Sequence, residues 1–268
     1  MYFLCKIYTK NHCFSLDAES ARAKIRQSRR LTAEIGAESM IYTRRTLISE
    51  GENRLPHTRP GRSSVLGFDV VTHRTDISSC VTIRTGELPD AASQKRAGDA
   101  LGQILKQFEP HGRILAAGIG NPAVTPDSPG PRCIGKLTPS PDTSPALFPV
   151  SPGIPASTGL DTAEVVKALA GTVHADCIIT VDALAAASED SLGTVIQITD
   201  QGTSPGSGTD SAVSGIICRE TMGIPVISVG VPTVIESGRM LVTPADCDRI
   251  AETYARVIAW GILRALFH

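Results

Sequence analysis

From residue 65 onward, the spacing of hydrophobic and polar positions changes along the chain in a repeating order. Short apolar runs predict strands, and longer segments with apolar residues three or four positions apart predict helices. The predicted strands are 66–71, 81–84, 113–118, 177–181, 194–198 and 224–229, and the predicted helices are 91–108, one beginning near residue 161, and 244–267. Such alternation is typical of an α/β fold, with a mostly parallel sheet flanked by helices on both faces.

The segments between these elements are polar or rich in proline. We expect a loop at 120–135 and an irregular linker at 138–157, where dense proline disfavours regular structure. Residues 1–60 are rich in Lys, Arg, Ser and Thr and lack a strong core pattern, with a predicted helix near 18–35 and a loop at 51–62. We therefore expect a peripheral or pro-segment-like region at 1–60 and a single α/β domain at 61–268. Met40 is an alternative start that would make residues 1–39 an upstream extension.

The composition is that of an ordinary globular protein, 41% hydrophobic and 20% charged, with a net charge of −1. This balance gives no indication of a nucleic-acid or membrane partner, and no apolar run approaches the ~18 residues that span a bilayer. The seven cysteines are odd in number and form no C-x-x-C pair, which favours free thiols in a reducing cytosol. The six histidines are scattered without an H-E-x-x-H pattern, so we expect neither a metal nor a cofactor.

Two aspartates follow predicted strands. Asp127 lies in the loop after 113–118, and Asp182 ends the strand 177–181. Sites in open parallel sheets form beyond the carboxyl ends of the strands. Two carboxyls that faced each other there would have split pKa values, so that one acts as base and the other as acid on a water molecule. The spacing does not place the two together, and either residue alone is compatible with a loop or cap role.

A glycine-rich segment at 202–208 follows another predicted strand. Its main-chain amides are suited to binding an anion or stabilising an oxyanion, although a plain turn fits the pattern equally well. Ser204 and Ser207 lie in this segment without the G-x-S-x-G pattern of a nucleophilic serine. The residues that we expect to line a site or contact a substrate are Asn121, Thr125, Gly130, Asp200, Ser204 and Gly206.

Several longer motifs occur in a fixed order over about residues 112–235. They are G-I-G-N-P-A-V-T-P-D-S-P-G-P at 118–131, S-P-G-I at 151–154, I-I-T-V-D-A-L-A-A at 178–186, T-V-I-Q-I-T-D-Q-G-T-S-P-G-S-G at 194–208 and G-I-P-V-I-S-V-G-V-P-T-V at 223–234. In this order they resemble the germination protease family.

The resemblance implies an endopeptidase, atypical among aspartic peptidases, that begins the degradation of small acid-soluble spore proteins when a spore germinates. It implies a phosphorylase/hydrolase-like fold similar to that of hydrogenase maturation proteases, and it makes Asp127 and Asp182 the catalytic pair. It further implies a precursor trimmed at its N-terminus, a homotetramer, and a cytoplasmic location in the forespore or spore core.

The chain departs from the family pattern in three respects. The family's R-T-D-L-A signature is only echoed by Arg45-Thr46-Leu47, with leucine in place of its aspartate, unless the later Asp76 supplies that motif. Ala187 replaces an arginine, and the chain is shorter than typical family members. These changes bear on zymogen control, oligomer contacts and substrate choice. Two alternatives stay open: a metal-dependent hydrolase in which the two aspartates are ligands, and a non-catalytic homologue with a binding role.

Overall fold

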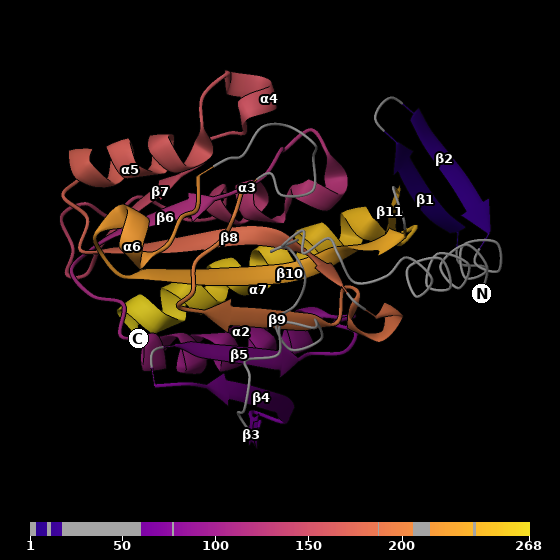
Figure 1. Ribbon diagram of the computed structural model, residues 1–268. Helices are drawn as coiled ribbons and strands as arrows, with labels where there is room; N and C mark the ends of the chain where they lie inside the picture. The colour runs from indigo at the N-terminus through magenta and orange to yellow at the C-terminus, as the bar shows by residue number, and fades with distance from the viewer. Residues whose placement is uncertain are drawn as a thin grey trace.

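The computed structural model describes residues 4–9, 12–17, 60–76, 78–186, 188–205, 215–237 and 240–268. Within these ranges, eleven strands form one sheet. Its parallel part has the order β7 (Ala146–Val150), β6 (Arg113–Gly118), β8 (Cys177–Ala186) and β10 (Val226–Ser237). The sheet continues from β10 through β9 (Val195–Thr199), β5 (Ser79–Arg84), β4 (Phe68–Arg74) and β3 (Gly61–Val65), each pairing antiparallel with the next. Figure 1 shows these strands side by side.

The α/β class is confirmed, but the sheet is mixed, and its parallel part is limited to four strands. The reason lies in the connections. Antiparallel neighbours can be joined by tight turns, whereas parallel neighbours need a long crossover. Strands β3 and β4 are separated by a two-residue turn at Leu66 and Gly67, and β4 and β5 by a similarly short segment. Such connections leave no room for a crossover helix.

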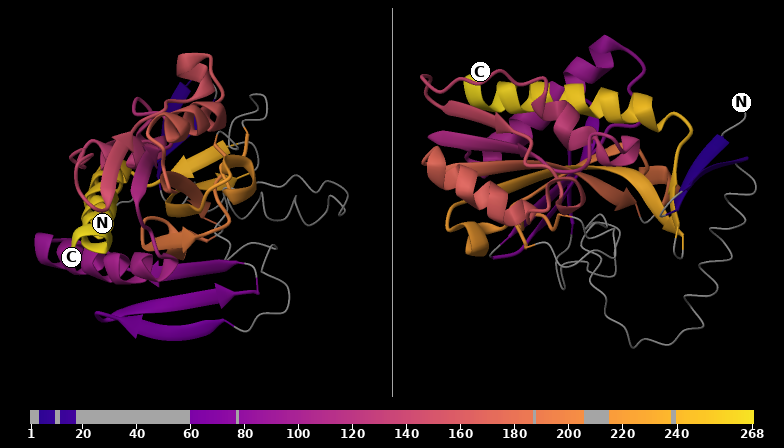
Figure 2. Two further views of the ribbon diagram at one scale, coloured as in Figure 1. Left: turned by 90° about the vertical axis from the view of Figure 1, so that its left-hand side faces the viewer. Right: turned by 90° about the horizontal axis from the view of Figure 1, so that it is seen from above.

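Helices cover both faces of the sheet, as predicted. One face carries α2 (Ala91–Leu105), α3 (Pro129–Ile134) and α7 (Cys247–Phe267), and the other carries α5 (Thr162–Thr172). Figure 2 shows α7 and α5 on opposite sides of the strands. Short helical turns complete the described elements: η1 (Lys106–Phe108), η2 (Thr125–Asp127), α4 (Pro155–Thr158), η3 (Glu189–Ser191) and α6 (Arg219–Met222).

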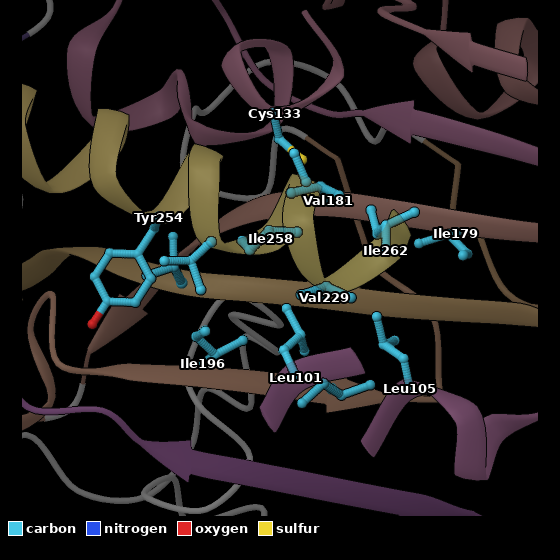
Figure 3. Packing of buried hydrophobic residues seen from close by; sticks show 14 of the residues in the cluster. Leu101, Leu105, Cys133, Ile179, Val181, Ile196, Val229, Tyr254, Ile258 and Ile262 are labelled. Carbon is cyan, nitrogen blue, oxygen red and sulfur yellow. The ribbon is translucent and has the colours of Figure 1, made fainter. Parts of the chain in front are cut away.

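The core has two parts, one on each face of the sheet. In β8, Ile179 and Val181 pack into the larger cluster beneath α2 and α7, while Ile178 belongs to the smaller cluster beneath α5. This alternation follows from the two-residue period of a strand. Figure 3 shows Val181 and Val229 of neighbouring strands beside Ile258 of α7. The continuous apolar runs of β8 and β10 are therefore explained by burial on both faces.

The expectations for 120–135 and 138–157 were wrong in part, because both segments contain regular structure. The first contains η2 and α3, and the second contains β7 and α4. Proline is tolerated in each case for a positional reason. Pro149 lies in β7, which pairs with β6 on one side and has only an isolated bridge, between Leu147 and Ser140, on the other. The missing amide hydrogen of Pro149 therefore costs no ladder bond on that side. Pro129 begins α3, where a helix amide has no intrahelical partner.

At the far end of β10, three more strands extend the sheet. Strand β11 (Met240–Thr243) pairs antiparallel with the end of β10, and β1 (Leu4–Thr9) pairs with β11 and with β2 (His12–Asp17). The helix expected at 18–35 and most of the loop expected at 51–62 lie outside the described residues. The division into a region at 1–60 and a domain at 61–268 stays a prediction.

Candidate active site

The carboxyl ends of β6 and β8 lie at a switch in the direction of the chain. Strand β6 is followed through α3 by β7 on one side, whereas β8 is followed by β9, which lies beyond β10 on the other side. Connections that leave adjacent parallel strands in opposite directions open a crevice, and α/β proteins place their sites there. Asp127 follows β6 and Asp182 lies in β8, so both candidate residues belong to this end of the sheet.

Asp182 is a buried carboxylate inside a strand, with 2% of its surface exposed. The prediction that it ends the strand was wrong, since β8 continues to Ala186. The pairing with β6, however, stops at Gly118 and Val181, so Asp182 is the first residue beyond that ladder. Its Oδ1 accepts a hydrogen bond of 2.8 Å from the main-chain N–H of Ala183, and its Oδ2 accepts one of 2.9 Å from the hydroxyl of Thr203.

Asp127 ends η2 and is partly exposed. Its Oδ2 accepts a hydrogen bond of 2.8 Å from the main-chain N–H of Asn121. Gly120 makes this approach possible, because its φ is 121° and a Cβ there would lie 2.0 Å from the carbonyl oxygen of Asp127. The carboxylate is therefore held over the turn that follows β6.

Main-chain contacts join the two segments. The N–H of Ile119 donates to the carbonyl of Val181 over 2.8 Å. This bond extends the contact between the β6 segment and β8 by one residue past the end of β6. Gly130, at the start of α3, lies so close that a Cβ there would be 2.4 Å from the carbonyl oxygens of both residues. The hydroxyl of Thr233 on β10 also donates to the carbonyl of Pro126 over 2.6 Å. The backbones that carry Asp127 and Asp182 thus meet at one edge of the sheet.

Four of the other expected site residues lie in the segments that carry Asp127 or Thr203. Asn121, Thr125 and Gly130 lie in the segment that carries Asp127, and Ser204 directly follows Thr203. Gly206 lies outside the described residues.

Asp200 is placed elsewhere. It accepts a hydrogen bond of 2.9 Å from the N–H of Ser79 and lines a cavity of about 470 Å³ with Arg74 and Arg219. Val226, the first residue of β10, also lines this cavity, whereas Asp182 pairs with Gly230 further along the strand. Asp200 therefore lies nearer the amino end of β10 than Asp182 does, although Thr203, three residues later, contacts Asp182.

Most of the cysteines in the described part of the chain are buried. Cys80, Cys133, Cys177, Cys218 and Cys247 have free thiols, as expected, and all but Cys218 are buried. Burial raises the pKa of Cys80 and of Cys177 to about 12. Because the thiolate is the reactive form, these side chains are core residues. Among the described residues, no group of three or more His, Cys, Asp or Glu side chains is arranged to hold a metal ion.

The germination protease family model matches residues 86–240, more than half of the chain. The match includes β6, β8, both aspartates and the loop that carries Thr203. The chain belongs to the germination protease family.

Curated germination proteases are similar to this chain over part of their length. The germination protease of Caldanaerobacter subterraneus is 36% identical over 162 residues, covering 55% of this chain and 50% of that protein. The germination proteases of Clostridium acetobutylicum and Priestia megaterium are 31% and 37% identical, with 57% and 53% of this chain and 65% and 40% of those proteins covered. The chain therefore spans about half the length of the curated germination proteases that it matches.

Among solved structures, the [NiFe] hydrogenase maturation protease HycI from Thermococcus kodakarensis aligns with 58% of this chain and 96% of its own. The TM-score is 0.38 and the sequence identity is 20%. Among the described residues, no helix has both the length and the apolar character needed to cross a membrane.

Sequence reasoning missed Thr203, whose hydroxyl donates directly to Asp182. It lies in the glycine-rich segment at 202–208, for which the sequence indicated two serines and main-chain amides that could bind an anion. The available signal was the position of this segment just after a buried strand, where side chains reach the site edge. That signal does not distinguish a threonine hydroxyl from the neighbouring Ser204.

Proposed function

We propose that this chain is an endopeptidase that begins the degradation of small acid-soluble spore proteins during germination, in the cytoplasm of the spore. Family membership supports the activity and the substrate class. The observation that carries the assignment to a site is the convergence of the segments bearing Asp127 and Asp182 at the switch point between β6 and β8. From the same resemblance, we also propose an N-terminally trimmed precursor and a homotetramer.

The proposed chemistry uses the two aspartates as an acid and base pair. One carboxylate removes a proton from a water molecule, whose oxygen attacks the carbonyl carbon of the scissile peptide bond, and the π electrons move to the carbonyl oxygen. The other carboxyl, protonated, donates its proton to the amide nitrogen. The electron pair on the oxygen then re-forms the C=O bond as the C–N bond breaks and the amine leaves. Neither a covalent intermediate nor a nucleophilic side chain is required. Asp182 is the buried carboxyl of the pair, and hydrogen bonds from Ala183 and Thr203 offset the cost of burying its charge.

The test replaces each aspartate by asparagine. We expect Asp127→Asn and Asp182→Asn each to lower the rate of cleavage of a small acid-soluble spore protein by about 10²- to 10⁴-fold, the usual contribution of a general acid or base. Asp142→Asn, which changes an exposed aspartate between α3 and β7, serves as the matched control and should leave the rate unchanged. Circular dichroism and thermal unfolding check that each variant is folded.

Two outcomes would contradict the proposal. A folded Asp182→Asn variant with the parent's rate would exclude the aspartate pair. Loss of the parent's activity on chelation, with recovery on adding one divalent ion, would instead make the carboxylates metal ligands. We expect the rate to be unaffected by the chelator.

A further inference from the structure

We propose that Thr203 is a positioning residue for Asp182, whose carboxylate it orients and favours in the ionised form. This inference rests on the proposed function, and it makes Asp182 the carboxylate of the pair that removes a proton from water. Thr203 lies 21 residues after Asp182 in the chain and contacts it only through the fold.

The two oxygens of Asp182 receive hydrogen bonds from different directions. Ala183, on the same strand, donates its N–H to Oδ1 over 2.8 Å, and Thr203, from the loop after β9, donates its hydroxyl to Oδ2 over 2.9 Å. The hydrogen bond from the strand neighbour to Oδ1 restrains rotation of the carboxylate about its side-chain torsions. A second donor on the other oxygen restricts that rotation, and donors to a carboxylate favour its charged form.

The main chain of Thr203 is itself held in place. Thr203 and Ile217 exchange two main-chain hydrogen bonds of 2.9 Å, which form an isolated antiparallel bridge. Gly202 permits this approach, since its φ is 83° and a Cβ there would lie 2.1 Å from the carbonyl oxygen of Ile217. Ile217 is fully buried in the cluster beneath α5. The hydroxyl of Thr203 is therefore positioned by the core and not by a freely moving loop.

The bridge is also connected to the start of α5. The N–H of Gly215 donates to Oδ2 of Asp161 over 2.9 Å, while Oδ1 of Asp161 caps the helix by accepting the N–H of Ala163. The segment from 215 to 217 is thus tied to α5 at one end and to Thr203 at the other. This arrangement gives the contact with Asp182 a rigid support, which a positioning residue requires.

The first test compares Thr203→Val with Thr203→Ser. Valine has the shape of threonine without the hydroxyl, so we expect kcat to fall about 10- to 100-fold while KM stays within about twofold of the parent's value. A fall of this size in kcat corresponds to the loss of one hydrogen bond to a charged group. Serine restores the donor and should keep kcat within about threefold of the parent's value. Thr199→Val is the matched control, because that hydroxyl bonds main-chain groups of Ser79 and Gln201 and should leave kcat near that of the parent.

A parent-like kcat in Thr203→Val would overturn the proposal, and so would an equal loss in Thr203→Ser. A rise in KM alone would also overturn it, because that result would mean a role in substrate binding instead of in orienting Asp182.

A second measurement does not depend on peptidase activity. Titration of the Asp182 carboxyl carbon by NMR should show half-ionisation at a higher pH in Thr203→Val than in the parent, and at the parent's pH in Thr203→Ser. The charged side chains that the structure describes on the elements in contact with β8 and on the Thr203 loop are the same in every variant: Arg113, Asp127, Arg132 and Asp200. An unchanged midpoint in the valine variant would overturn the inference. If the parent chain cleaves no spore protein, the proposed function fails, and this titration still decides the role of Thr203.

Discussion

Gly130 allows the segment that carries Asp127 to lie directly against the sheet. It is buried at the start of α3, and its α-carbon lies between the carbonyl groups that end β6 and the paired part of β8. A side chain at this position would meet main-chain oxygens, which cannot rotate away as a flexible side chain can. The position of the whole η2 and α3 segment relative to Asp182 therefore depends on the absence of one methyl group.

Gly130→Ala should consequently lower both stability and activity. We expect a loss of about 1–3 kcal/mol in the free energy of unfolding, as for other overpacked sites, because the backbone must shift to remove the contacts of 2.4 Å. Thermal unfolding and the cleavage rate measure the two effects. Gly135→Ala is the matched control, since a Cβ there meets nothing closer than 3.6 Å and the residue is exposed. Equal melting temperatures for the two variants would contradict this account.

At the scale of elements, α2 and α7 pack through small residues. A Cβ on Gly98 would lie 2.6 Å from the Trp260 ring, and one on Gly261 would lie 2.6 Å from Leu101. The indole N–H of Trp260 donates to Asp99 over 2.9 Å, so the close packing also brings polar partners together. Backbones that approach this closely leave no space for side chains at the crossing, and α7 is thereby fixed over the larger core.

Gly102→Ala tests this packing. A Cβ at this position would lie 2.7 Å from Cβ of Arg264 and 3.1 Å from the carbonyl oxygen of Gly261. Alanine raises helix propensity by about 1 kcal/mol, but we expect the crowding at the crossing to exceed that gain, so that the melting temperature falls. Gly171→Ala on α5, where a Cβ would meet nothing within 4 Å, should leave the melting temperature equal or slightly higher. A more stable Gly102→Ala would show that the helices can separate without cost.

Across the whole molecule, several carboxylates are stabilised in their charged form. The hydrogen bond from Lys136 is the main cause that lowers the pKa of Glu252, with further contributions from Arg256. The pair of Lys136 and Glu252 joins the segment just after α3 to α7. Burial raises the pKa of Asp99, but the hydrogen bonds from Trp260 and Lys95 outweigh it and the net shift is downward. The main-chain N–H of Ser93 lowers the pKa of Asp90, which caps α2.

These shifts predict loss of stability in acid. A carboxylate whose pKa is lower in the folded chain contributes stability that is present above its unfolded value, near pH 4, and lost as pH falls through the folded value. We expect Glu252→Gln to be less stable than the parent by up to about 1 kcal/mol at pH 7 and to converge with it near pH 3. Urea unfolding at several pH values measures the difference, with Glu87→Gln, an exposed site, as the control. A difference that grows towards acid pH would contradict the assigned sign.

Most of the regular elements were predictable from the sequence because their signals are local. The helices at α2 and α7 and the strands β6 and β8 lie where the hydrophobic spacing indicates them. Strand β7 was not predictable, because proline disfavours a strand in local propensity. Pro149 is tolerated only because β7 lies at the edge of the sheet. The antiparallel pairing of β9 with β10 and β5 also depends on which distant segments meet. No local pattern encodes that information.

For the candidate site, the residue order by itself identified Asp127 and Asp182 as charged groups beside apolar strands, because that pattern is contained within a few neighbouring positions. It also indicated Asp200 as a residue lining the site, and in the fold Asp200 accepts a hydrogen bond from the N–H of Ser79. Only the tertiary structure decided that Thr203 donates to Asp182 and that Gly130 lies between the two strand ends. Both contacts join residues far apart in the chain through the sheet and its core, and sequence spacing carries no record of such distances.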